Sequence, residues 1–371
     1  MTPLPDRYCP VDGTRVPAES FAWCCPVCHG PLDLDFAPTP APLKSLAGRV
    51  NSLWRYAETL PLAAPSVSLG EGRTPLVELK DGIWTKLDFL TPTLSFKDRG
   101  AVLLAELALR LRPRQVLADS SGNAGTAIAA YCARAALPCT VYVPEGVSTK
   151  KLEQIRAHGA RVRVVDGDRE AAARAAREAA DEPEVFYASH VFNPYFLHGT
   201  KTYTHELWED LGGRLPDVLV LPVGNGTLLL GAALAVAELY AAGLLDRRPA
   251  LYAVQAAAVA PLAHAFEEGA DDLVDTAPTT GTGPTFAEAI AVPRPLRARQ
   301  ILRAVRDSGG RFLTVTEDQI RHAQLDLASR GLYVESTGVV CWAAVRDGVL
   351  GSRSAAVPLC GAGLKTGLAG S

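Results

Sequence analysis

The sequence has little net charge, no long apolar run and no internal repeat. A net charge of −3 over 371 residues provides no strongly charged face for nucleic acid or an anionic membrane. No hydrophobic stretch reaches the ~20 residues of a membrane-spanning helix, and the first residues lack the basic start and apolar core of a signal peptide. We therefore expect a cytoplasmic protein that binds neither nucleic acid nor a membrane.

The composition does not match a disordered chain or a disulfide-rich one. It is 48% hydrophobic and 21% charged, as in globular proteins. Since 371 residues are more than a domain with one hydrophobic core usually contains, we expect two domains and a small extra module. Of the eight cysteines, four lie within residues 9–28 and the others are scattered in apolar surroundings. This distribution favours a reducing compartment with a metal site over a disulfide framework.

The N-terminal cysteines lie in two similar short segments, residues 9–13 and 25–30. Four thiolates at this spacing would strongly indicate a zinc ribbon, but an aspartate stands at the second position. A segment that keeps its turns and holds no metal is therefore an open alternative. The proline-rich residues 38–42 then form a linker. The expected zinc ligands are Cys9, Cys25 and Cys28, with Asp12, Cys24 or His29 as the fourth.

Short apolar runs and helical segments alternate from about residue 83 to residue 260. This alternation predicts open parallel sheets with helices on both faces, in which ligands bind beyond the carboxyl ends of the strands. Strands are expected at residues 83–88, 115–119, 139–143, 161–165, 185–188, 217–221, 251–254 and 355–359. Helices are expected at residues 43–60, 101–111, 148–158, 169–180, 300–308 and 317–330. One more helix follows residues 120–125 and runs through residue 137, another is opened by residues 333–338 and runs through residue 345, and a third begins near residue 228.

Lys97 lies where a strand gives way to a helix, within the segment Ser95-Phe96-Lys97-Asp98-Arg99-Gly100. An amine held there is partly desolvated, so its pKa falls and it becomes a nucleophile able to form a Schiff base. The alternative is a lysine that extends from a helix start into solvent, and this hexapeptide alone favours that alternative.

Two loops that follow strands have the residues of an anion site. Residues 224–227 supply glycines that let the backbone approach an anion, ahead of a helix start with free N–H groups. The third glycine and the ribose-binding acid of the dinucleotide fingerprint are missing, so the loop fits a phosphate or is a plain strand–helix turn. Residues 120–125 place Asn123 and small residues at another helix start, suited to a carboxylate or a phenolic oxygen.

Taken in order, these segments resemble those of threonine synthases, in the fold-type-II family of pyridoxal-phosphate enzymes. The likeness covers essentially the whole chain. It implies two open twisted-sheet α/β domains of the tryptophan synthase β-like kind, with a small zinc-ribbon-like segment at residues 1–40. The large domain would comprise residues 41–89 and 201–371, and the small one residues 90–200. The segments that carry the resemblance are residues 53–56, 60–61, 69–76, 95–100, 120–125, 193–195, 199–202 and 224–227.

The resemblance also implies roles for single residues. Lys97 would hold pyridoxal 5'-phosphate as a Schiff base and move protons, and Asn123 would bond the phenolic oxygen of the cofactor. Cys360 would be a neutral partner of the pyridine nitrogen, which weakens the electron sink. The expected cofactor-binding residues are Phe96, Lys97, Asn123, Val223, Gly224, Asn225, Gly226, Thr227 and Cys360, and the expected substrate-binding residues are Ser95, Ser121, Gly122 and Ala124.

The implied enzyme is a homodimeric lyase that converts O-phospho-L-homoserine and water to L-threonine and phosphate. Four positions depart from the family pattern. Leu94 replaces a glycine, so the pocket or its backbone must differ there, and Cys360, Ser336 and His198 stand where Thr, Pro and an acid are common. β-Replacement or β-elimination on a serine-like amino acid is therefore an alternative. A non-catalytic binding protein is a third, disfavoured by the mildly acidic charge and by Lys97.

Overall fold

The computed structural model describes residues 3–62, 65–80, 82–147, 149–273 and 283–370. The chain divides into two compact units. Unit 1 consists of Met1–Ala41, Leu46–Gly72 and Lys97–Thr200, and unit 2 of Pro42–Ser45, Arg73–Phe96 and Lys201–Ser371. The three-part domain division expected from the sequence stays a prediction. None of the helices in the described ranges combines the length and the apolar character needed to cross a bilayer.

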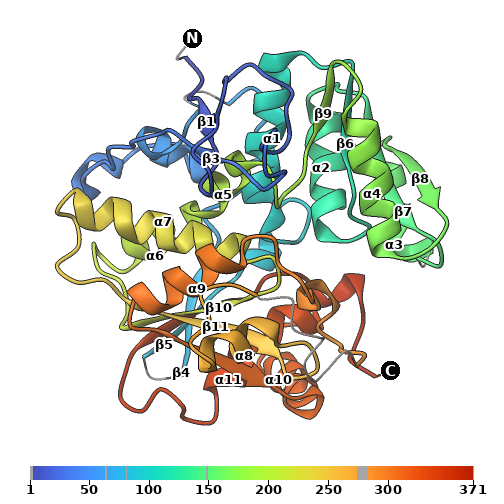
Figure 1. Ribbon diagram of the computed structural model, residues 1–371. Coiled ribbons are helices and arrows are strands. Elements are labelled where there is room, and N and C mark those ends of the chain that lie inside the picture. Colours follow the sequence, from blue (N-terminus) through green and yellow to red (C-terminus); the bar gives the residue numbers. More distant parts are fainter. Residues whose placement is uncertain (1–2, 63–64, 81, 148, 274–282, 371) are drawn as a thin grey trace. The chain divides into compact units, whose positions relative to one another are not determined.

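Unit 1 contains two sheets (Figure 1). The small one is antiparallel with the order β2-β1-β3, and the larger one is parallel with the order β8-β7-β6-β9. The four parallel strands are those that the apolar runs predict. The strands are β1 (Arg7–Tyr8), β2 (Arg15–Val16), β3 (Asp33–Leu34), β6 (Gln115–Ala118), β7 (Cys139–Pro144), β8 (Arg161–Val165) and β9 (Val185–Tyr187).

The helices of unit 1 surround an apolar core. Helix α1 buries almost its whole circumference, which explains why its sequence is a run of Ala and Leu without a polar stripe. It packs against α2 and α5. The helices are α1 (Lys97–Leu111), α2 (Asn123–Arg134), α3 (Thr149–Ala157), α4 (Arg169–Ala180) and α5 (Pro194–Thr200).

Unit 2 is built on a six-stranded sheet with the order β12-β11-β10-β13-β5-β4. All neighbours in it are parallel except β4 and β5. The strands are β4 (Leu76–Lys80), β5 (Ile83–Lys86), β10 (Val218–Pro222), β11 (Ala250–Ala256), β12 (Arg311–Val315) and β13 (Ala355–Pro358). The helices are α6 (Thr202–Asp210), α7 (Thr227–Ala241), α8 (Pro261–Glu267), α9 (Ala298–Asp307), α10 (Glu317–Ser329) and α11 (Val340–Val345).

The helix expected at residues 43–60 is not continuous. The structure has two short 3-10 helices there, η1 (Leu43–Leu46) and η2 (Leu53–Thr59). Gly48 between them has φ of 74°, a left-handed conformation that interrupts a right-handed helix. Ser52 then caps η2, because its side chain accepts a hydrogen bond from the Trp54 N–H. Further 3-10 helices are η3 (Asp88–Leu90), η4 (Glu288–Ile290), η5 (Ser336–Val339) and η6 (Gly363–Lys365).

Candidate active site

Lys97 is the first residue of α1 and is half-buried. Its Nζ lies 5.7 Å from the centroid of the Phe196 ring on α5. Two glycines bring these helices together: a Cβ on Gly100 would lie 2.4 Å from the Phe196 ring, and one on Gly199 would lie 2.0 Å from the Arg99 carbonyl oxygen. Close backbone packing therefore fixes the base of the Lys97 side chain beside an aromatic ring, an environment that only partly solvates an ammonium group.

His190 is a further group near Lys97 that the sequence reasoning missed. It follows β9 and is buried. Burial lowers the pKa of His190 well below its usual range, and the positive charges of Lys97 and Arg169 lower it further. His190 is therefore neutral at pH 7. Its position just after the carboxyl end of a parallel strand is the signal that could have identified it.

Two other lysines are less suited to bind a cofactor covalently. Lys201 is fully buried with its Nζ 2.7 Å from the Glu238 carboxylate, and burial lowers its pKa to about 8 despite that partner. Lys86 is fully buried between Glu206 and Asp210 of α6, at 3.1 and 2.7 Å. Both amines are enclosed and held by carboxylates, whereas Lys97 is half-exposed at a helix start.

The loop that leads to Asn123, which begins at the end of β6 and ends at the start of α2, lies in unit 1. Asn123 begins α2 and is half-buried, as is Ser121, while Gly122 is exposed and provides no side-chain cap. A Cβ on Gly125 would lie 1.7 Å from the Ser120 carbonyl oxygen, so the first turn can pack against the loop only with glycine there. A helix start without a side-chain cap suits an anionic ligand group, which fits the substrate carboxylate expected at Ser121, Gly122 and Ala124.

The loop at residues 223–227 joins β10 to α7 in unit 2. Val223 is buried, and Gly226 forms the N-cap of α7 with φ of 73° and no side-chain cap. A Cβ on Gly224 would lie 2.8 Å from Ile290 Cα, so this loop excludes side chains. Within the described residues, the N–H groups of Gly224, Asn225 and Gly226 have no backbone acceptor. A glycine cradle with open amides at a helix start fits the phosphate of the expected cofactor.

The segment before Lys97 is paired to Cys360 and its neighbours in unit 2. The Phe96 N–H donates to the Cys360 carbonyl oxygen at 3.0 Å, and Ser95 forms an isolated bridge with Gly361. Cys360 is itself buried. The Ser95 hydroxyl is buried and has no hydrogen-bond partner among the described residues. A buried hydroxyl of this kind fits a residue that bonds a ligand, as expected for Ser95.

Leu94, which replaces the family's glycine, has φ of 63°. The backbone therefore has a left-handed conformation that a glycine adopts freely and a leucine adopts at a cost. Hydrogen bonds on both sides hold this conformation: the Leu94 N–H donates to the Thr91 carbonyl at 2.8 Å, and its carbonyl accepts from the Ala362 N–H at 3.1 Å.

Leu94→Gly is expected to give a more stable protein than Leu94→Ala, by about 1 kcal/mol. Both changes remove the leucine side chain, but only glycine removes the cost of a left-handed residue, about 1–2 kcal/mol. Urea unfolding of the two variants under the same conditions measures the difference. In a right-handed helical position the order is reversed, so an alanine variant equal to or more stable than the glycine variant would contradict the left-handed conformation.

Two other departures from the family pattern have packing roles. His198 on α5 makes an edge-on contact with the Phe36 ring, with centroids 5.5 Å apart. The Ser336 hydroxyl donates to the Phe286 carbonyl oxygen at 2.5 Å. Each side chain is thus engaged within its own unit, so neither departure by itself argues for a changed substrate.

Glu71 explains why residues 69–72 form a recognisable segment. Its carboxylate is fully buried and accepts hydrogen bonds from Trp54 Nε1 at 2.7 Å and from the Tyr131 hydroxyl at 3.0 Å. It also accepts from the Ser68 hydroxyl and the Leu69 N–H. A buried carboxylate with four donors is fully compensated, so this turn is structural.

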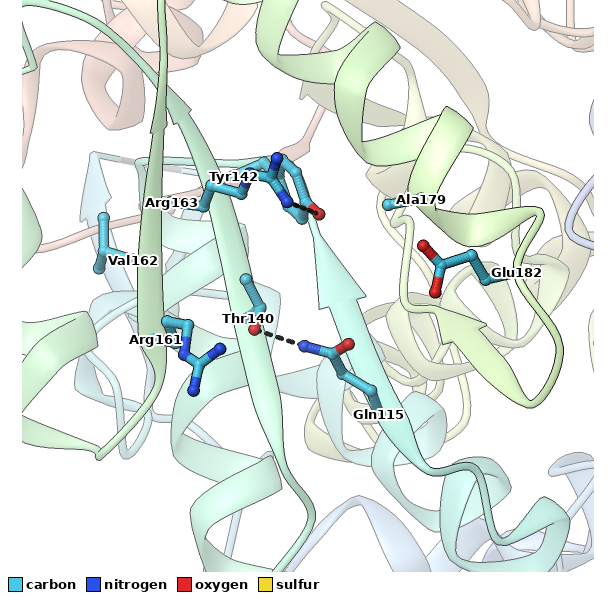
Figure 2. Close-up of a pocket in the computed structure, with 8 residues that line it drawn as sticks. All are labelled: Gln115, Thr140, Tyr142, Arg161, Val162, Arg163, Ala179 and Glu182. Carbon is cyan, nitrogen blue, oxygen red and sulfur yellow. Dashed lines mark hydrogen bonds between the residues drawn. The ribbon is translucent and has the colours of Figure 1, made fainter.

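A separate polar hollow lies on the larger sheet of unit 1 (Figure 2). Its volume is about 260 Å³, and none of the expected site residues lines it. Arg163 donates to the Tyr142 hydroxyl at 3.3 Å, and Gln115 donates to the Thr140 hydroxyl at 2.6 Å. Because no expected site residue lines it, this hollow is distinct from the candidate active site.

Comparisons with known proteins find relatives over most of the chain. A family model described as "Pyridoxal-phosphate dependent enzyme" matches residues 67–361. The threonine synthase of Methanosarcina acetivorans is 32% identical over 356 residues, which covers 91% of this chain and 86% of that protein. The threonine synthase of Methanocaldococcus jannaschii is 34% identical over 304 residues, covering 79% and 74%.

Solved structures show the same fold. A threonine deaminase from T.th. is 28% identical with a TM-score of 0.66, covering 78% of this chain and 92% of that one. Maize serine racemase is 20% identical with a TM-score of 0.67, covering 78% and 88%, and at that identity the likeness concerns the fold alone.

Proposed function

The chain belongs to the threonine synthase family of pyridoxal-phosphate dependent enzymes, and on this basis we propose that it converts O-phospho-L-homoserine and water to L-threonine and phosphate. The observation that carries the proposal is the similarity to a threonine synthase over 91% of the chain. The fold-type-II α/β fold, the lyase class and the pyridoxal-phosphate cofactor expected from the sequence are confirmed.

The residues that would hold the cofactor have suitable chemistry. The loop at residues 224–227 would bind the phosphate through backbone amides and the start of α7. Asn123 would donate its side-chain amide to the phenolic oxygen, and Phe96 and Val223 would border the ring. Cys360 is a weak donor, so it would leave the pyridine nitrogen largely unprotonated. When bound, the cofactor supplies an electron sink that acidifies C–H bonds of the substrate.

Proton movement would fall to Lys97. Its Nζ would attach the cofactor and, after substrate exchange, would accept a proton from substrate carbon and return one to the neighbouring carbon. The half-buried position of Lys97 at the start of α1 would leave its Nζ within reach of the cofactor and the substrate. Backbone N–H groups of Ser121, Gly122 and Ala124, with the Ser95 hydroxyl, would bind the substrate carboxylate.

We further propose a cytoplasmic homodimer that takes a small amino-acid substrate and binds neither nucleic acid nor a membrane. The family supports the substrate class, and the near-neutral net charge of −3 supports the absence of polyanion binding.

Release of inorganic phosphate tests the reaction. Purified enzyme loaded with pyridoxal phosphate is expected to release phosphate and form L-threonine from O-phospho-L-homoserine in equal amounts. L-Serine and L-threonine serve as comparison substrates. Pyruvate or 2-oxobutyrate from these, with no phosphate from O-phospho-L-homoserine, would overturn the proposal in favour of β-elimination on a serine-like amino acid.

A further inference from the structure

The two N-terminal cysteine segments have the same backbone geometry. In the first, the Cys9 N–H donates to the Thr14 carbonyl at 2.8 Å and the Gly13 N–H to the Cys9 carbonyl at 3.0 Å. In the second, the Cys25 N–H donates to Gly30 at 2.9 Å and the His29 N–H to Cys25 at 3.0 Å.

Each segment also has a left-handed residue at its fifth position, Gly13 with φ of 76° and His29 with φ of 56°. The two turns are therefore equivalent position by position. In this equivalence Asp12 occupies the place that Cys28 occupies in the second turn.

The side chains at these equivalent positions converge on one point. The ligand atoms of Cys9, Asp12, Cys25 and Cys28 all lie within 4.8 Å of one another. The Cys9 and Cys28 Sγ atoms are 3.4 Å apart, and Cys25 Sγ is 3.4 Å from Asp12 Oδ2. A tetrahedral Zn²⁺ with Zn–S of ~2.3 Å and Zn–O of ~2.1 Å separates its ligand atoms by about 3.5–3.8 Å. The two separations of 3.4 Å are close to these values, and the upper limit of 4.8 Å lets the four side chains reach one ion.

The surroundings of the four side chains support an ion. The Val11 N–H points at Cys9 Sγ at 3.4 Å, and the Val27 and Cys28 N–H groups point at Cys25 Sγ at 3.4 and 3.5 Å. Backbone donors of this kind stabilise thiolate charge around a metal. The Thr14 N–H donates to Asp12 Oδ1 at 2.9 Å, which orients the carboxylate so that Oδ2 approaches Cys25.

Cys24 and His29, the other candidates for the fourth ligand, lie outside this cluster. Cys24 packs instead against an apolar cluster that includes Tyr187 and Phe192. Three-dimensional proximity therefore selects Asp12, which the spacing in the sequence leaves as one of three candidates.

We propose that this segment binds one structural Zn²⁺ through Cys9, Asp12, Cys25 and Cys28. The apolar cluster immediately around the four side chains is small and consists of Cys9, Val16, Cys25 and Leu32 with the partly buried Ala22. A metal would add to the stability of such a small cluster. With four protein ligands the site has no open position, so its role is structural rather than catalytic. One carboxylate in place of a thiolate makes the site weaker than a four-cysteine site.

The zinc content of the full-length holoenzyme tests this inference. Protein produced with zinc in the medium is expected to contain about one Zn per chain, as measured by inductively coupled plasma mass spectrometry. Outer-shell partners alone are worth about 10–100-fold in metal affinity, so Asp12→Ala is expected to lose zinc to a chromogenic chelator at least tenfold more readily. Asp12→Cys, which completes four thiolates, is expected to resist the chelator better than the wild type.

Cys24→Ser is the matched control, because it removes a neighbouring thiol outside the cluster and is expected to keep one Zn per chain. Wild-type protein that contains no zinc after it has been supplied with excess zinc would overturn the site. Wild-type chelator resistance in Asp12→Ala, or loss of zinc in Cys24→Ser, would overturn the assignment of Asp12. Asp12→Cys retains every thiol, so it keeps the test decisive if Asp12→Ala fails to fold. The metal content is independent of pyridoxal-phosphate binding and of the proposed reaction.

Discussion

Lys97→Ala is expected to leave the purified protein colourless and to lower phosphate release from O-phospho-L-homoserine by at least about 10³-fold. The variant loses both the amine that attaches the cofactor and the base that moves protons, and a positioned acid–base group alone contributes about 10²–10⁴-fold. A protonated Schiff base of pyridoxal phosphate absorbs visible light, so the wild type is expected to be yellow. Absorbance spectra and phosphate assays of both proteins, each incubated with the cofactor, measure the change.

Two further variants distinguish the loss of covalent cofactor attachment from the loss of the positive charge of Lys97. Lys97→Arg keeps a positive charge at the start of α1 but cannot form the covalent bond, so it is expected to behave like the alanine variant. Lys80→Ala changes an exposed lysine on β4 and is expected to keep the visible absorbance of the wild type. A Lys97→Ala protein that stays yellow would contradict the assignment, and borohydride reduction with peptide mass spectrometry would then identify the attached lysine.

Lys86→Met is expected to lower the free energy of unfolding by about 3–5 kcal/mol. Lys86 on β5 and Glu206 on α6 are both fully buried, and the Lys86 Nζ also donates to the Thr74 carbonyl at 2.6 Å. Methionine has a similar volume, so the loss reflects chiefly the buried carboxylate left without its cation. Urea unfolding monitored by tryptophan fluorescence measures it.

The surface variant Lys80→Met is the control for this change and is expected to stay within about 0.5 kcal/mol of the wild type. Its Nζ donates to the Arg346 carbonyl at 2.8 Å, at an exposed position. A loss below about 1 kcal/mol for Lys86→Met would mean that water reaches Glu206 in solution, contrary to its full burial.

The sequence predicted most strands of both units because most of the parallel strands are short apolar runs. It did not assign β1 to β4, and it missed β12, whose residues are mostly half-exposed. The helix expected at residues 43–60 was wrong because apolar spacing does not report the left-handed Gly48. Local patterns reveal an element's exposed and buried positions but not a single residue's φ.

The candidate site was predictable only where chemistry is local. Lys97, Asn123 and the glycine loop each lie at a strand–helix junction, and that junction is visible in the sequence. The fourth member of the cysteine cluster, the environment of His190 and the packing of His198 depend on residues distant in the chain. No spacing rule could supply them, and the roles of the site residues stay predictions until the Lys97 variants are measured.

The strand order of unit 2 has a consequence for biosynthesis. Strand β13 lies between β10 and β5, so the six-stranded sheet cannot be completed until residues 355–358 have left the ribosome. The larger sheet of unit 1 is complete at residue 187. Until β13 has left the ribosome, the apolar strands β10 and β5 each therefore have one edge without its neighbouring strand. During this interval the growing polypeptide is most exposed to aggregation and most dependent on chaperones.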